Sequence, residues 1–246
     1  MTVKYNLGLV SVSFRKHTPK EILEAMNLAG LEFVEWGSDV HAPPEKASEI
    51  AALQKNYGIK CCSYGTYFKI GVTPIQELKT YIDAAKTLGT NILRLWCGDK
   101  NSEDYTVEEK LGFFNICKAV AKIAEENGAV LCMECHGGTY TNTKESAYEL
   151  MQAVDSESFR MYWQPNQHRT VSENIEYAKL LAPYTKHLHV FNWSGSQKYP
   201  LALAKDIWKE YLCCFDTQKT LLLEFMPDGK IESLSGEAEA LKEIVK

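Results

Sequence analysis

The sequence predicts an α/β protein built as a single (β/α)8 TIM barrel, and two observations support this fold class. Short apolar segments of strand length recur eight times with helix-type segments between them, or about 31 residues per unit over the 246 residues. Strands that alternate with helices in this way pair in parallel, with the helices outside the sheet. The units also follow one another without a linker, so residues 1–246 are expected to form one domain. No glycine-rich phosphate loop follows the first segment to favour an open sheet instead.

The predicted strands are five to seven residues long. They are Asn6–Val12, Glu32–Trp36, Ile59–Ser63, Asn91–Trp96, Ala129–Glu134, Phe159–Trp163, His187–Phe191 and Thr220–Phe225. Helix starts are indicated by capping boxes, in which a Thr N-cap precedes Glu or Gln by three residues, at Thr18, Thr73, Thr106 and Thr170. Helix ends are indicated by glycines that follow helix-type segments, at Gly30, Gly58, Gly89 and Gly128.

Composition excludes several classes of function. The net charge of −5 is spread along the chain, which argues against a nucleic-acid partner, because such binding needs a concentrated positive surface. No run approaches 18 apolar residues, so no membrane span is expected. The first residues lack the pattern of a signal peptide, and the eight cysteines lack zinc-finger spacing. We therefore expect a cytoplasmic protein with reduced cysteines.

The segment Ala129–Tyr140, AVLCMECHGGTY, is the most informative stretch for function. It begins as an apolar strand and ends in Glu134 and His136, which point to the same face because side chains alternate along a strand. A carboxylate and an imidazole at the end of a buried strand are costly unless something binds there. The alternative is an ionic cluster without chemistry.

In a (β/α)8 barrel the carboxyl ends of the strands form the active-site face. The polar or aromatic residues predicted at those ends are Glu35, Arg94, Trp96, Glu134, His136, Gln164, His189 and Glu224. The last four strands thus end in Glu, Gln, His and Glu. Two carboxylates, an imidazole and an amide oxygen form a ligand set for a divalent metal. Without a cation the two carboxylates would repel each other.

Other candidates have a structural and a functional interpretation. Arg94 suits an anion or hydroxyl of a substrate, or forms an inner salt bridge with Glu35. Trp96 suits the apolar side of a sugar, or packs the rim of the barrel. His41 follows the second strand and is placed to reach a substrate. His187 is expected to be a core histidine, and His168 a solvated one.

Several motifs resemble a known family. They are Val34–Gly37 with Asp39–His41, Glu134–Thr139, Tyr162–Pro165, His187–Val190 and Leu223–Phe225. With them the chain resembles the xylose-isomerase-like TIM barrel superfamily, which holds sugar phosphate isomerases and epimerases and the family 2 AP endonucleases. The resemblance implies one divalent ion, Mn, Zn, Mg or Co, held by Glu134, Gln164, His189 and Glu224. The family has Asp where this chain has Gln164, which brings no charge. Gln167 and Lys198 stand where the family's epimerases bind substrate with His and Arg.

The resemblance implies an isomerase or epimerase of a sugar, sugar phosphate or related hydroxy-carbonyl compound. Glu134 and Glu224 would move a proton by way of a metal-bound enediolate, and His136 would orient a hydroxyl. Two alternatives are a sugar-binding barrel without turnover and a metal-assisted dehydratase of a cyclic polyol. The endonuclease branch is disfavoured because the strand ends offer too few His and Asp ligands. A homo-oligomer is left open.

Overall fold

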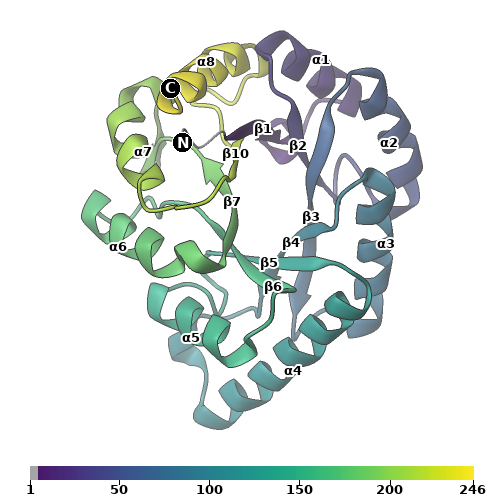
Figure 1. Cartoon of the computed structure of the whole chain (residues 1–246), viewed down its shortest axis with the longest axis vertical. Coiled ribbons are helices and arrows are strands. Elements are labelled where there is room, and N and C mark those ends of the chain that lie inside the picture. Colours follow the sequence, from purple (N-terminus) through teal and green to yellow (C-terminus); the bar gives the residue numbers. More distant parts are fainter. Residues whose placement is uncertain (1–4) are drawn as a thin grey trace.

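The computed structural model describes residues 5–246 and is a closed barrel of eight parallel strands, which confirms the predicted fold class (Figure 1). Neighbouring strands follow the order β1-β10-β7-β6-β5-β4-β3-β2 around the ring. The barrel strands are β1 (Asn6–Val10), β2 (Phe33–Gly37), β3 (Lys60–Ile70), β4 (Ile92–Cys97), β5 (Val130–Glu134), β6 (Phe159–Trp163), β7 (Thr185–Val190) and β10 (Thr220–Leu223). All eight correspond to predicted strands.

Helices surround the barrel in chain order, and α1 packs against α8 where the ring closes (Figure 1). They are α1 (Pro19–Ala29), α2 (Ala47–Asn56), α3 (Leu78–Leu88), α4 (Val107–Glu126), α5 (Lys144–Val154), α6 (Val171–Leu181), α7 (Lys205–Leu212) and α8 (Leu234–Ile244). The main apolar core lies between strands and helices. A second, small cluster of Val10, Cys132, Tyr162 and Leu222 fills the barrel interior. No helix within residues 5–246 is long and apolar enough to cross a membrane.

Three of the four predicted capping boxes are present, at Thr18, Thr106 and Thr170. The prediction at Thr73 is wrong. Its hydroxyl accepts a hydrogen bond from the backbone N–H of Lys69 at 3.0 Å, and α3 begins only at Leu78, after a short 3-10 turn. The four predicted glycines do end their helical segments with positive φ, as at Gly30 (φ 67°) and Gly89 (φ 92°), a conformation that costs glycine little.

Strand β3 is longer than predicted, and this affects the pocket. Its second part, beyond Gly65, pairs with the end of β4 through Lys69 and Ile70 after a shift in register. Gly65 interrupts the apolar pattern, which is why the prediction ended the strand too early. The extension carries Tyr67 to the mouth of the barrel. A two-stranded hairpin, β8 (Trp193–Ser194) and β9 (Gln197–Lys198), forms within the predicted long loop after β7.

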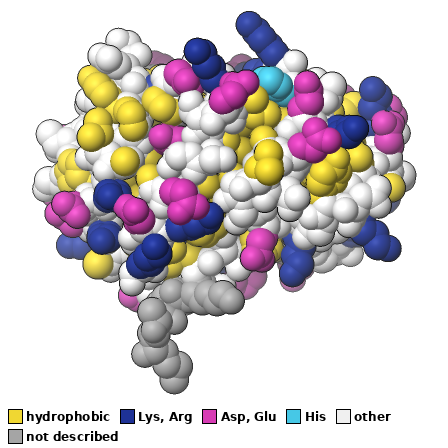
Figure 2. Space-filling view, turned by 90° about the horizontal axis from the view of Figure 1, so that it is seen from above, with side chains coloured by type: hydrophobic (Ala, Val, Ile, Leu, Met, Phe, Trp, Pro, Cys, Tyr) yellow, Lys and Arg dark blue, Asp and Glu magenta, His cyan; other side chains and the backbone are white. Residues whose placement is uncertain are grey.

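The surface and the cysteines agree with the composition. On the face drawn in Figure 2, Lys and Arg side chains are interspersed with Asp and Glu and do not form a continuous basic area. All eight cysteines are free, and Cys61, Cys97, Cys117 and Cys132 are buried. Burial raises the pKa of the Cys61 thiol to about 12. Cys61 is therefore a protonated packing group.

Candidate active site

A pocket of about 410 Å³ opens at the carboxyl ends of the strands. It is lined by Val12, Arg15, Tyr67, Arg94, Trp96, Glu134, Cys135, His136, Gly137, Gln164, Pro165, Asn166, Gln167, His168, Phe191, Trp193, Glu224 and Phe225. Seven of the eleven residues predicted for the site are among them: Arg94, Trp96, Glu134, His136, Gln164, Gln167 and Glu224. Strand-end side chains therefore converge as the barrel geometry requires.

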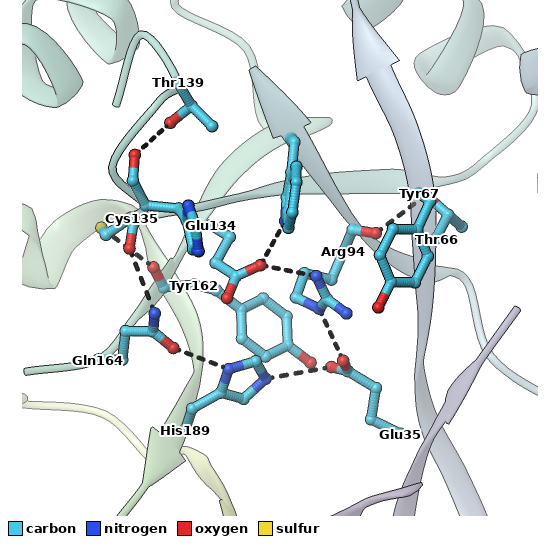
Figure 3. Close-up of polar contacts among 12 residues, drawn as sticks. Glu35, Thr66, Tyr67, Arg94, Glu134, Cys135, Thr139, Tyr162, Gln164 and His189 are labelled. Carbon is cyan, nitrogen blue, oxygen red and sulfur yellow. Dashed lines mark hydrogen bonds and ion pairs between the residues drawn. The ribbon is translucent and has the colours of Figure 1, made fainter. Parts of the chain in front are cut away.

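His189 lies beneath these residues and connects them. Its Nδ1 is 3.0 Å from Oε1 of Gln164 (Figure 3). The same Nδ1 is 3.4 Å from Oε2 of Glu224. The amide of Gln164 donates through Nε2 to the Cys135 carbonyl at 3.2 Å, so its oxygen faces the imidazole. Within the described chain, Oε2 of Glu224 accepts no hydrogen bond although it is buried. Three atoms able to bind a metal thus lie close together, one from the residue after β6, one from β7 and one from the residue after β10.

Glu134 completes this group from β5. Its Oε2 accepts hydrogen bonds from Nη1 of Arg94 and Nε1 of Trp96, both at 2.6 Å, and its other oxygen is turned towards Gln164 and His189 (Figure 3). Burial by itself would raise the pKa of Glu134, but the charges of Arg94 and His189 bring it below its usual value. Glu134 is therefore an ionised and firmly oriented carboxylate.

Glu224 is in the opposite electrostatic situation. Burial raises the pKa of Glu224 to about 7, with a further contribution from the negative charge of Glu134. Burial would lower the pKa of His189, but Glu224 and Glu35 raise it above its usual value. The two carboxyl groups of the pocket thus differ, since Glu134 is held ionised whereas Glu224 holds its proton up to near-neutral pH.

The chemistry of these donors fits a divalent ion. The described residues contain no group of three His, Cys, Asp or Glu side chains placed to hold a metal. In the candidate set one position is Gln164, and Glu134 contacts Arg94. With the amide oxygen of Gln164 included, two oxygen atoms lie near Nδ1 of His189: Oε1 of Gln164 at 3.0 Å and Oε2 of Glu224 at 3.4 Å. Ligands that share one ion at about 2.1 Å are separated by about 3 Å. The buried Oε2 of Glu224, which has no hydrogen-bond donor among the described residues, also fits a cation.

Aromatic side chains enter the pocket from two sides. Trp96 stacks on His136 with ring centroids 4.9 Å apart, and Tyr67 packs against Trp96 at 5.8 Å. On the β7 and β10 side, Trp193 packs against Phe225 at 5.2 Å. These rings leave the polar groups on the floor between flat apolar surfaces, an arrangement suited to a ring or a short carbon chain bearing hydroxyl groups.

Four predicted site residues lie outside the lining. One of them is His189, described above. Another is Glu35, which is fully buried and forms a salt bridge with Arg94 at 2.7 Å. This salt bridge is one of the two roles predicted for Arg94. His41 is 2% exposed, and its Nδ1 is 3.0 Å from the Ser11 hydroxyl, so the structure gives it no access to a ligand in the pocket. Lys198 is not a lining residue, and its Nζ lies 4.6 Å from the ring centroid of Phe225, which is one.

Sequence reasoning missed lining residues of the first half of the barrel. Arg15 follows the 3-10 turn after β1, forms an ion pair with Asp39, and donates through Nη1 to the Tyr67 hydroxyl at 3.1 Å. No local pattern indicated these partners, because Asp39 lies in the turn after β2 and Tyr67 in the extension of β3. His168, expected to be solvated, also lines the pocket. Phe225 has a positive φ of 57° immediately after Glu224, an unfavourable conformation that is concentrated at functional sites in proteins.

His187 behaves as the sequence predicted, as a core histidine one layer below the pocket. Its Nε2 is 3.3 Å from the Cys62 carbonyl oxygen, and its ring packs against Tyr162 at 5.4 Å. Burial lowers its pKa to about 4, so the ring is neutral at physiological pH. Its place in the fold separates it from His189, which faces the donor group.

Comparison with known proteins identifies the family. The family model described as a xylose isomerase-like TIM barrel matches residues 23–202. A 3-dehydroshikimate dehydratase of Bacillus anthracis is 21% identical over 212 residues, which cover 79% of this chain and 73% of the relative. The crystal structure of a probable 3-DHS dehydratase from the same organism superposes with a TM-score of 0.82 at 18% identity, covering 97% of this chain and 99% of the other.

Two other solved structures show the same fold. A D-psicose 3-epimerase of Clostridium cellulolyticum, determined with D-tagatose, has a TM-score of 0.68 at 14% identity and covers 96% of this chain and 97% of its own. The IOLI protein, determined with a bound zinc atom, has a TM-score of 0.75 at 17% identity and covers 98% of both chains. Identities this low establish the shared fold, whereas reaction and substrate must be argued from the pocket.

Proposed function

The chain belongs to the xylose isomerase-like TIM barrel family, and from this membership and the pocket we propose that it is a divalent-metal-dependent enzyme. Its reaction begins by removing a proton from the carbon beside a carbonyl group, in a sugar, a sugar phosphate or a related hydroxy-carbonyl compound. The observation that carries the proposal is the unequal pair of buried carboxyl groups, Glu134 and Glu224, on either side of His189 and Gln164.

The ligands of the metal would be Glu134, Gln164, His189 and Glu224. A divalent ion in this place supplies an electrophile that polarises the carbonyl oxygen of the substrate. Because Gln164 is neutral where the family has Asp, this site carries one negative charge fewer, and weaker metal affinity follows. The metal could be Mn, Zn, Mg or Co, since the donor set does not discriminate among them.

The protein's own groups have distinct tasks in this reaction. Glu134 is fixed through Oε2 by Arg94 and Trp96, which leaves its other oxygen facing the pocket as the base that removes the proton. Glu224, on the other side of His189, returns a proton to the substrate or to a departing hydroxyl. The stacked rings of Trp96 and His136 bound the space in which the substrate's hydroxyl groups lie.

Two outcomes follow from the same first step. Return of the proton to carbon gives an epimer or an isomer, and the two carboxyl groups on separate strands support this outcome. Protonation of a neighbouring hydroxyl, which then leaves as water, gives dehydration. The similarity over nearly the whole chain to the Bacillus anthracis dehydratases supports this second outcome equally. A sugar-binding barrel without turnover is the remaining alternative.

The test combines metal analysis with product analysis. The purified protein is analysed by plasma mass spectrometry and then assayed with 3-dehydroshikimate and with D-psicose, D-tagatose and D-fructose in D₂O. Conjugated product from 3-dehydroshikimate identifies a dehydratase, and deuterium on carbon identifies an epimerase or isomerase. We expect activity to disappear with a chelator and in Glu134→Gln. Glu237→Gln, which changes a carboxylate that does not line the pocket, serves as the control. Ligand binding without turnover, unaffected by chelator, would leave the binding-protein interpretation.

A further inference from the structure

A second cavity lies on the opposite face of the barrel from the candidate active site. Its volume is about 360 Å³, and it lies between the segments that lead into β7 and β10. It is lined by Lys179, Ala182, Pro183, Cys213, Cys214, Asp216, Thr217 and Lys219. These residues precede their strands in the chain, so the cavity is at the amino ends of the strands. It shares no lining residue with the active-site pocket.

Lys219 is the most buried charged residue of this cavity, at 7% exposed. Its Nζ donates hydrogen bonds to the Thr185 carbonyl and to the Thr217 hydroxyl, both at 2.7 Å. Both acceptors are uncharged. Every ion pair that a lysine forms within residues 5–246 belongs to another lysine. Lys219 is therefore a buried positive charge without a carboxylate partner in the described chain.

This arrangement is costly for the folded protein. Burial lowers the pKa of Lys219 from its ordinary value, and the positive charge of Lys186 lowers it further, whereas Asp216 acts in the other direction. A neutral amide side chain donates two hydrogen bonds without the cost of burying a charge. An ammonium group has three N–H donors, of which the described residues accept two. The charge and the third donor therefore remain for a partner from outside the chain.

Two other lining residues add to this donor group. Lys179 stands in the last turn of α6 and, like Lys219, has no ion-pair partner among the described residues. The Thr217 hydroxyl accepts from Lys219, which leaves its own hydrogen free to donate. Asp216 is the acidic residue of the lining, so two lysines face one carboxylate. The cavity thus has a net positive charge.

We propose that this cavity binds a small oxyanion, of which inorganic phosphate is the simplest example. The anion would accept hydrogen bonds from Lys219, Lys179 and the Thr217 hydroxyl, and its charge would compensate the buried ammonium group. Lys219 immediately precedes β10, and its contact with Thr185 joins it to the start of β7. The barrel itself thus fixes the central donor. The proposal does not depend on the proposed function, because the two sites are on opposite faces of the barrel.

The decisive experiment locates bound phosphate by NMR. Metal-free protein is titrated with inorganic phosphate, and a titration with chloride at the same ionic strength is the reference. We expect the backbone amide signals of Thr217 and Lys219 to shift to saturation with phosphate only. The signals of His136 and Gln167, which line the active-site pocket, should stay where they are. Shifts confined to the active-site pocket, or no saturable shift at Thr217 and Lys219, would overturn the proposal.

A lysine variant tests the central donor. Lys219→Met keeps an unbranched side chain but removes the charge, and phosphate affinity should fall about 10- to 100-fold, the size of a lost hydrogen bond between charged groups. The matched control is Lys79→Met, which removes an equal charge from an exposed ion pair with Asp83 outside the cavity. Its affinity should not change. Equal affinities in the two variants would show that Lys219 does not bind the anion.

Asp216→Asn tests the site in the opposite direction and does not disturb the buried lysine. Asp216 is exposed, and its removal takes a like charge away from the anion. Phosphate affinity should therefore rise about fivefold, the effect of one unit charge a few ångströms away in water. Asp83→Asn, which removes an equal charge elsewhere on the surface, is the control and should leave the affinity unchanged. Unchanged or weaker phosphate binding in Asp216→Asn would contradict the proposed site, even if Lys219→Met does not fold.

Discussion

The two halves of the barrel contribute different kinds of side chain to the pocket. Strands β5, β6 and β7 and the end of β10 bring the donor group of Glu134, Gln164, His189 and Glu224. Strands β2 and β4 bring Glu35 and Arg94, which are buried and paired. On the proposed function, the second half supplies the reactive groups, and the first half orients them and balances their charge.

Arg94 forms two contacts with carboxylates beneath the donor group, and this division between the halves explains them. Arg94 lies between Glu35 and Glu134 at 2.7 and 2.6 Å, so one cation compensates two anions from separate strands. A buried arrangement of this kind contributes little net stability, but removing one member leaves an uncompensated charge. Changes in the second half should therefore reduce activity, and changes in the first half should reduce stability.

The largest expected effect is on turnover, in the second half. Glu224→Gln should lower kcat by about a thousandfold, within the range of a lost acid–base group. The metal-free variant should be at least as stable as the natural protein, because Gln keeps the shape of a carboxyl group that is costly to ionise there. Steady-state kinetics and urea unfolding measure the two effects. Near-normal turnover would remove Glu224 from the reaction.

The next effect is on stability, in the first half. Arg94→Met should lower the free energy of unfolding by about 3–5 kcal/mol, because Glu35 and Glu134 lose their common partner inside the protein. Lys79→Met, which removes an exposed ion pair with Asp83, is the control and should change it by less than about 1 kcal/mol. Equal changes in the two variants, measured by urea unfolding, would show that the buried pairs are not special.

A third prediction concerns pH. The folded-state pKa of Glu224, about 7, is above its ordinary value of 4.5, so the folded protein binds this proton more tightly than the unfolded chain. The resulting stability is fully present below pH 4.5 and is lost as the pH rises towards 7. The loss is on the order of 3 kcal/mol, at about 1.4 kcal/mol per pKa unit. Urea unfolding of the metal-free protein should show this slope, and Glu224→Gln should lack it.

Local sequence rules predicted the fold and the second half of the pocket well. Glu134, Gln164 and His189 end or follow apolar strands, where alternation and barrel geometry fix which way they point. The capping prediction at Thr73 failed because the chain there forms a 3-10 turn, and the Thr hydroxyl binds Lys69 instead. Propensity rules do not encode such a competing contact.

The first half could not be predicted to the same extent, because its side chains are placed by partners distant in sequence. Arg15 owes its orientation to Asp39 and Tyr67, from the loop after β2 and from β3. His41 has the sequence position of a ligand-binding residue but turns inward to Ser11. Such choices depend on which tertiary contacts form.

The smallest expected effect tests whether the first half also touches the substrate. Arg15 lines the pocket with a side chain that is 48% exposed, so a contact with a substrate would be weakened by solvent. Arg15→Ala should raise KM about fivefold, which corresponds to about 1 kcal/mol of binding free energy. It should leave kcat and the stability nearly unchanged, because the guanidinium contacts Asp39 and Tyr67 and not the donor group. Lys100→Ala, which breaks an exposed ion pair with Glu109 outside the pocket, is the control. If the two variants have the same KM, the first half only supports the pocket. If only Arg15→Ala raises it, the loop after β1 supplies a substrate contact that the donor strands do not.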